Sequence, residues 1–153
     1  QDVPFWDALD FVGIDAYFPL TKKDDPNIDE LKQGWSGVAD EIGAWLAEKN
    51  SDKGVIMTEL GYVSSDGTNS QPWATLAHPE DQDEQAECLE AAFQVLSERA
   101  WFRGVYLWQY FPVDRWSPIG YPIRGKKAEK VLEKWYGKLT TKEKTVGKEE
   151  VLR

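Results

Sequence analysis

Four side chains that could take part in chemistry on a sugar stand toward the ends of apolar segments of this sequence: Asp15, Tyr17, Glu59 and Trp108. A carboxylate can attack or stabilise an anomeric centre, and a phenol can orient that carboxylate by donating a hydrogen bond to it. An indole offers a flat apolar floor for a sugar ring. This chemistry requires the four side chains to lie close together, so it depends on how the elements that carry them are arranged.

Three apolar segments predict short buried strands, and three amphipathic stretches predict helices between and after them. The expected strands cover residues 9–17, 55–60 and 104–110. The expected helices show apolar faces at steps of three and four, namely Ile28, Leu31, Trp35, Val38, Ile42 and Trp45 in the first, Ala86, Leu89, Phe93, Leu96 and Ala100 in the second, and Ala128, Val131, Leu132 and Trp135 in the third. This alternation predicts an α/β fold with right-handed crossovers and a parallel sheet.

Side-chain alternation along the strands favours a piece of a (βα)8 barrel over an open doubly wound sheet. Apolar sets suited to packing under helices are Val12, Ile14 and Ala16 on the first strand and Val105 and Leu107 on the third. The opposite, interior face then receives Asp15, Tyr17, Glu59 and Trp108, and alternation places Val55 and Met57 there beside Glu59. An open sheet would bury both carboxylates beneath a helix, which is costly.

Composition narrows the class of partner. The chain has 153 residues and a net charge of -9, which argues against binding to nucleic acid or to anionic membranes and favours a neutral substrate. No apolar run approaches the roughly 18 residues needed to cross a bilayer. The single cysteine, Cys88, cannot form an internal disulfide, and no cluster of residues indicates a metal or another cofactor.

Four segments in order resemble the last three βα units of glycoside hydrolase family 113, a group of endo-β-mannanases in a large retaining clan of (βα)8 enzymes. The segments are FWDALDFVGIDAYFPL, VIMTELGYVSSDGTNSQPWA, GVYLWQYFP and RGKKAEKVLEKWY, and the resemblance covers roughly residues 4–137. It implies a partial TIM barrel containing strands six to eight. It also implies that Glu59 is the catalytic nucleophile, that Trp108 ends the eighth strand and that Tyr17 is the aromatic residue beside the nucleophile.

The sequence departs from the family pattern in one respect that bears on activity. The clan takes its acid/base glutamate from the end of the fourth strand, and nothing in this chain precedes the sixth. Retaining hydrolysis needs two carboxyl groups roughly 5 to 5.5 Å apart. We therefore expect Gln1 to mark a cut inside a longer chain, and we expect the fragment to be inactive without the missing barrel units.

Several candidate residues also have a plain structural interpretation. Glu59 could be a strand-end carboxylate satisfied by neighbouring amides, and Asp15 could be a hydrogen-bonding centre inside the barrel rather than a substrate ligand. Tyr17 could orient the nucleophile or simply pack in the core, and Trp108 could pack rather than carry sugar. Two loop indoles at the carboxyl ends of strands, Trp73 and Trp116, are the remaining candidates for contact with substrate.

The predicted function is hydrolysis of a β-1,4-linked hexose polysaccharide, most of all β-mannan, through a glycosyl intermediate on Glu59. The alternatives are a carbohydrate-binding barrel relative without catalysis and a glucanase or xylanase of the same clan. A polysaccharide substrate slightly favours an extracellular or cell-surface location, although the sequence leaves the compartment open.

Residues 1–137 are expected to form the barrel part and residues 138–153 a charged, poorly ordered tail. An open interior face exposing Phe11, Met57, Tyr106 and Trp108 should make the isolated fragment aggregate or partly unfold.

Overall fold

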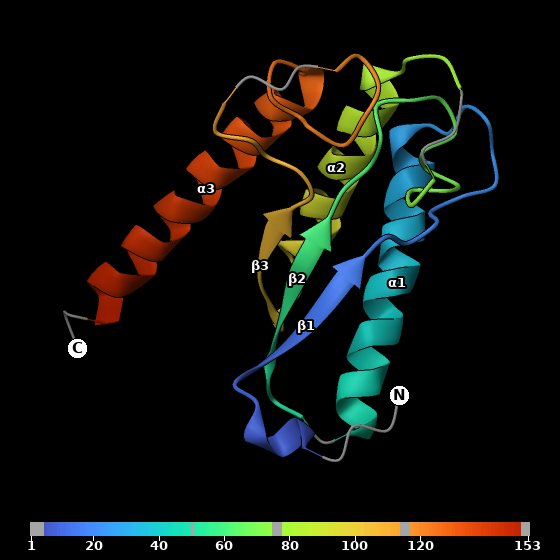
Figure 1. The fold of residues 1–153 in the computed structure, drawn as a ribbon. Helices are drawn as coiled ribbons and strands as arrows, with labels where there is room; N and C mark the ends of the chain where they lie inside the picture. The colour runs from blue at the N-terminus through green and yellow to red at the C-terminus, as the bar shows by residue number, and fades with distance from the viewer. Residues whose placement is uncertain (1–4, 50, 75–77, 114–116, 151–153) are drawn as a thin grey trace.

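A three-stranded parallel sheet forms the centre of the computed structural model, which describes residues 5–49, 51–74, 78–113 and 117–150. Its strands are β1 (Phe11–Ala16), β2 (Gly54–Leu60) and β3 (Phe102–Leu107), in the order β1-β2-β3 (Figure 1). A single 3-10 turn, η1 (Trp6–Ala8), precedes β1. The expected alternation of strands and helices is confirmed, and the arrangement is that of three consecutive βα units of a TIM barrel.

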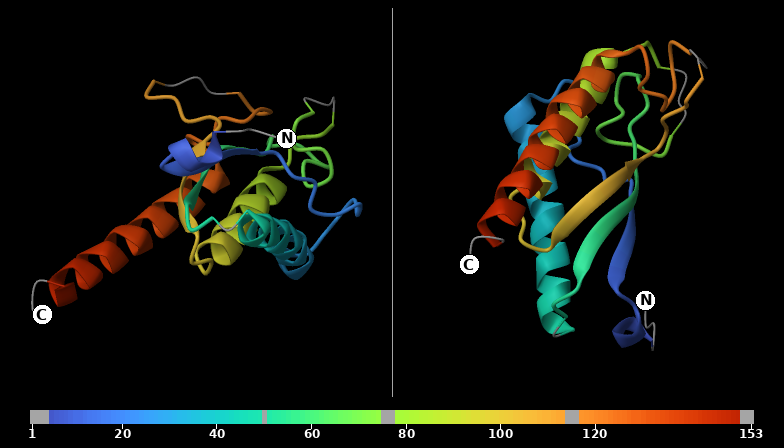
Figure 2. Two further views of the ribbon diagram at one scale, coloured as in Figure 1. Left: turned by 90° about the horizontal axis from the view of Figure 1, so that it is seen from below. Right: turned by 90° about the vertical axis from the view of Figure 1, so that its left-hand side faces the viewer.

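Three helices accompany the strands: α1 (Ile28–Glu48), α2 (Gln82–Leu96) and α3 (Lys127–Glu150). A capping box starts α1, because the Asn27 side chain accepts from the backbone of Glu30 while the Glu30 side chain accepts from the backbone of Asn27. The helices lie on one side of the sheet, with α1 packed on α2 and α2 on α3 (Figure 2). Within the described ranges, no helix covers the opposite side, which we call the helix-free face.

The core lies between the sheet and the helices α1 and α2. The side chains buried in it show that one prediction made from alternation is wrong. Val55 and Met57 were expected on the helix-free face, but both are completely buried beneath the helices. The reason is a β-bulge in β2. Ile14 pairs with Met57 whereas Asp15 pairs with Glu59, so Thr58 is an extra residue and the alternation changes sides there.

The helix-free face exposes three of the four residues that the sequence predicted to be exposed there. Phe11, Tyr106 and Trp108 are exposed, with 68% of Tyr106 accessible to solvent, whereas Met57 contributes nothing. The prediction that the fragment aggregates on its own therefore rests on these three aromatic side chains.

The helix α3 continues through residues 138–150, which the sequence predicts as a poorly ordered tail. Lysine and glutamate, which dominate this segment, are good helix formers even where no apolar stripe is present. The backbone is therefore helical where the absence of a periodic apolar pattern suggested no regular structure. The order of this segment in solution stays a prediction.

Candidate active site

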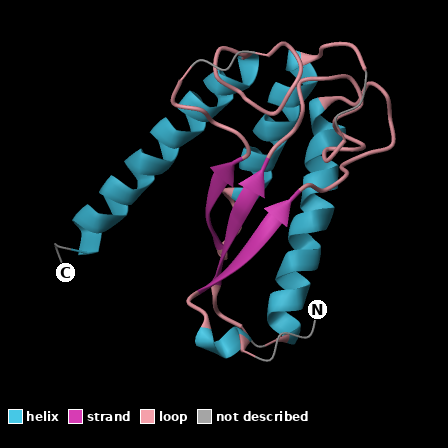
Figure 3. Cartoon of the chain, viewed as in Figure 1, coloured by secondary structure: helices cyan, strands magenta, loops and turns pink. Residues whose placement is uncertain are grey.

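The loops that follow the three strands gather at the carboxyl ends of the strands, above the sheet (Figure 3). Glu59 stands at this end of β2. The next residue, Leu60, pairs with Ala16, and both are buried against the helices. Glu59 pairs instead with Asp15, which is exposed on the helix-free face. Because paired residues of parallel strands point to the same side, the Glu59 carboxylate lies on the helix-free face.

Tyr17, the residue that follows β1, holds this carboxylate. Its hydroxyl donates a hydrogen bond of 2.7 Å to Oε2 of Glu59. Burial raises the pKa of the Tyr17 phenol far above its ordinary value, and the bond to the Glu59 carboxylate raises it further. The phenol therefore stays protonated and remains a donor. Between described residues, the second carboxylate oxygen, Oε1, makes no hydrogen bond.

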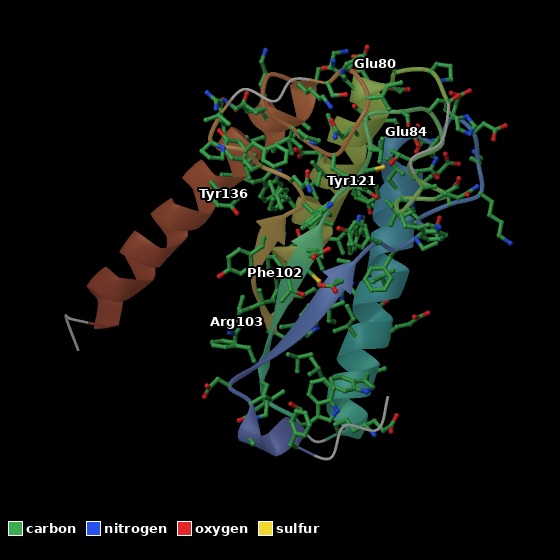
Figure 4. The ribbon with its side chains drawn as sticks, viewed as in Figure 1. Glu80, Glu84, Phe102, Arg103, Tyr121 and Tyr136 are labelled. Atoms are coloured by element: carbon green, nitrogen blue, oxygen red, sulfur yellow. The ribbon has the colours of Figure 1, made fainter. Side chains whose placement is uncertain are left out.

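A second tyrosine, Tyr121, also lies near Glu59 and was not predicted from the sequence. Its ring meets that of Tyr17 edge to face, with centroids 6.0 Å apart, and its hydroxyl donates to the carbonyl of Pro72 at 2.7 Å. It lies beside the end of β2 (Figure 4). Burial raises the pKa of Tyr121, and the negative charge of Glu59 raises it further. Spacing could not reveal this residue, because it comes from the long loop after β3.

Polar side chains behind the site fix the backbone of Tyr121. Gln85 of α2 donates through Nε2 to the carbonyls of Tyr62 and Gly120, at 2.8 and 3.2 Å. Lys126 donates through Nζ to Ser64 Oγ at 2.8 Å and to the carbonyl of Gly120 at 3.0 Å. Burial lowers the pKa of Lys126. These contacts join the loop after β2 to the loop after β3, from which Tyr121 comes.

Trp108 follows β3 directly, since the strand ends at Leu107 rather than continuing to Tyr110 as predicted. Leu107 pairs with Leu60 and packs on the core, so the next side chain, Trp108, turns to the helix-free face, where it is 40% exposed. Its backbone N–H donates to the carbonyl of Leu60 at 2.9 Å. A Cβ at Gly61 would come within 2.0 Å of the Trp108 carbonyl oxygen, so only glycine permits this close approach.

The family model of Glycoside Hydrolase Family 113 matches residues 1–138. The chain belongs to glycoside hydrolase family 113. A solved structure of a GH113 β-1,4-mannanase is 28% identical to the chain, with a TM-score of 0.70 over 89% of this chain and 41% of that one. The GH113 β-mannanase AaManA from Alicyclobacillus acidocaldarius is 27% identical, with a TM-score of 0.63 over 90% of this chain and 42% of that one.

A GH2 β-galacturonidase from Eisenbergiella tayi shares the fold at 24% identity, with a TM-score of 0.52 over 84% of this chain and 24% of that one. No curated protein sequence matches the chain. The chain thus spans about two fifths of the length of the solved family 113 mannanases that it matches, 41% and 42%.

The remaining candidates differ in where this family 113 chain places them. Asp15 is exposed on the helix-free face and accepts a hydrogen bond of 2.7 Å from Thr58 Oγ1. Trp73 is 57% exposed in the loop after β2, directly after Pro72. Trp116 falls outside the described residues. The structure therefore brings Tyr17 into contact with both Glu59 and Tyr121 and sets Asp15 and Trp108 on the same face as Glu59.

Neither a metal nor a membrane span is indicated in the described ranges. They contain no group of three or more histidine, cysteine, aspartate or glutamate side chains that could hold a metal ion. None of their helices combines the length and apolar character required to traverse a bilayer.

Proposed function

We propose that this chain forms the last three βα units of a retaining glycoside hydrolase that cleaves β-1,4-linked hexose polysaccharide, most of all β-mannan, with Glu59 as nucleophile. The observation that carries this proposal is the Glu59 carboxylate itself. It stands at the carboxyl end of β2 on the helix-free face, and the neutral phenol of Tyr17 donates to only one of its oxygens. The family membership and the solved mannanases support the choice of substrate.

In this mechanism Oε1 of Glu59 attacks the anomeric carbon, and the bond from that carbon to the leaving oxygen breaks. An acid protonates the leaving oxygen, and a glycosyl ester on Glu59 results. The group that acted as the acid is now a base. It takes a proton from water, which attacks the anomeric carbon and releases Glu59. Two displacements at one carbon return the original β configuration. Tyr17 keeps Oε2 occupied and stabilises the carboxylate charge before attack.

The acid/base carboxyl is assigned to a part of the barrel that lies outside this chain. Family 113 structures are more than twice as long as the chain, and retaining hydrolysis requires a second carboxyl roughly 5 to 5.5 Å from the nucleophile. We accordingly propose that these three units are inactive alone and act within the closed barrel.

Exposed indoles around Glu59 are proposed to bind the sugar rings. Trp108, on the same face as Glu59, and Trp73, in the loop after β2, are proposed as the platform. Trp116, which lies outside the described residues, is proposed from its place in the sequence alone. Apolar stacking on neutral rings suits a chain with a net charge of -9. Asp15, also on this face, is the remaining candidate from the sequence for contact with substrate.

The test uses the full-length protein that carries this chain, with β-mannan, β-glucan and xylan as substrates. We expect hydrolysis of mannan, appearance of the β-anomer first by ¹H NMR, and covalent labelling of Glu59 by a 2-deoxy-2-fluoro glycosyl reagent, located by peptide mass spectrometry. Glu59→Gln should remove both activity and label, whereas Glu98→Gln, at the opposite end of the sheet, should change neither.

Binding of manno-oligosaccharide without any hydrolysis would replace this proposal by the carbohydrate-binding alternative. Hydrolysis of glucan or xylan in preference to mannan would keep the mechanism and change the substrate. Full mannanase activity in Glu59→Gln would exclude Glu59 as the nucleophile.

A further inference from the structure

The β-bulge at Thr58 determines which way Glu59 faces. Met57 is completely buried on the helix side. Uninterrupted alternation from Met57 would turn Thr58 to the helix-free face and Glu59 back beneath the helices. The extra residue instead leaves Thr58 and Glu59 on the same side and returns Leu60 to the core. The functional carboxylate is exposed only because one residue interrupts the pattern.

Two contacts hold the extra residue. The Thr58 hydroxyl donates to Asp15 Oδ1 at 2.7 Å, which ties the bulge to the neighbouring strand at the register position of Glu59. The Thr58 methyl group sits over Gly13, where an added Cβ would come within 2.9 Å of Thr58 Cγ2. The missing side chain at position 13 therefore makes the space that the Thr58 side chain fills.

We propose that Thr58, held by Asp15 and seated over Gly13, is a positioning residue that aims the Glu59 carboxylate at the anomeric carbon. The inference rests on the proposed function, since it concerns the same reaction. It assigns Asp15 a role through Thr58 rather than through direct contact with sugar. A bulge beside a reacting group is a recurring means of directing a side chain out of the regular pattern.

The experiment compares Thr58→Val with Thr58→Ser in the full-length protein. Valine keeps the shape and the methyl contact with Gly13 but removes the hydroxyl, whereas serine keeps the hydroxyl. The proposal expects Thr58→Val to lower kcat on mannan about ten-fold, the lower end of the range for loss of one hydrogen bond to a charged group, and to slow labelling of Glu59 by the fluoroglycoside equally. The KM of Thr58→Val should stay within about two-fold of wild type, as expected for loss of alignment alone. Thr58→Ser, which keeps the hydroxyl, should stay close to wild type in both kcat and KM.

A second pair of variants tests the route through Asp15. Asp15→Ala should reproduce the Thr58→Val effect, and the double variant should be no worse than either single one, because both remove the same bond. Asp15→Asn retains an acceptor oxygen and should recover most of the activity. Gly13→Ala places a methyl group against the Thr58 side chain and should also lower kcat. This variant provides the test if Thr58→Val does not unfold cooperatively.

The outcomes separate this inference from the proposed function. If wild type is labelled at Glu59 but Thr58→Val retains wild-type kcat and labelling rate, the positioning role is wrong and the nucleophile assignment stands. A rise in KM after Asp15→Ala, with effects that add to those of Thr58→Val, would also overturn it and would make Asp15 a direct sugar ligand. Absence of label on wild-type Glu59 would defeat the proposed function itself.

Discussion

Two glutamates near the carboxyl ends of the strands, Glu59 and Glu84, show how surroundings distinguish the proposed nucleophile from a structural carboxylate. Glu84 lies in the first turn of α2 (Figure 4). It is only 7% exposed. It accepts three bonds of 2.8 Å, from the backbone N–H groups of Gly67 and Asn69 and from Asn69 Nδ2. Glu59 is partly exposed, and among the described residues it accepts one bond, from Tyr17.

The difference lies in what remains available on each carboxylate. Both oxygens of Glu84 are occupied by donors that would otherwise be unsatisfied, so this side chain orders the loop after β2. Glu59 keeps Oε1 available on a face that no described helix covers. A glutamate thus orders a loop at position 84 and is the proposed nucleophile at position 59.

The largest effect is expected from removing the Glu59 side chain. Glu59→Ala in the full-length protein should lower kcat by at least about 10³-fold, because no other group can form the ester. Added azide should restore turnover and yield a glycosyl azide of inverted configuration, since one displacement replaces two. The melting temperature should not fall. Rescue by azide in Glu84→Ala instead would reverse the assignment of the two carboxylates.

Removing Glu84 should act on stability first. Glu84→Ala leaves three donors without their acceptor, and we expect the free energy of unfolding to fall by about 3 kcal/mol. Urea titration followed by tryptophan fluorescence measures the loss, with the exposed Glu98→Ala as control. An unchanged midpoint would show that the loop after β2 is held by other contacts.

A smaller effect is expected from Tyr17→Phe, which leaves Glu59 in place and removes its one hydrogen bond. Loss of a bond to a charged acceptor is worth about 1.5 to 3 kcal/mol, so kcat should fall about 10- to 100-fold with little change in KM. Tyr106→Phe, on the same face, is the matched control and should retain activity. Equal effects of the two substitutions would remove the special role of Tyr17.

The smallest effect concerns the pH dependence of stability. Burial raises the pKa of Glu84, although its N–H donors oppose that shift. The folded state then holds a proton that the unfolded state has released, so the contribution of Glu84 is full below the ordinary glutamate pKa and declines as pH rises through the raised value. Glu84→Gln should lose less stability than wild type between about pH 4 and 7. Unfolding curves at both pH values test this, and a steeper loss in the variant would contradict it.

Much of this architecture could be predicted from the pattern of residues. The apolar steps from Ile28 to Trp45 predicted α1 closely, and the apolar segments predicted all three strands to within a few residues. The order of these elements predicted parallel βα units, since crossover handedness leaves few alternatives. Glu59, Tyr17 and Trp108 were singled out because strand ends and residue type are both readable along one chain.

Contacts between distant segments could not be predicted in this way. Tyr121 and Lys126 come from the loop between β3 and α3, and Gln85 comes from α2, so their bonds depend on the packing of one unit against the next. Strict alternation also placed Met57 wrongly, because nothing in the letters VIMTEL marks Thr58 as an extra residue.

The sequence by itself determined the elements and their order, and it singled out Glu59 as the proposed nucleophile, because local periodicity and residue chemistry depend only on neighbours along the chain. Alternation predicted the face of Glu59, but only the tertiary structure decided that a bulge at Thr58 brings the carboxylate to that face and that Tyr121 lies against Tyr17. Register between strands is set by the fit of Thr58 to Gly13 and Asp15, which is a property of two strands rather than one.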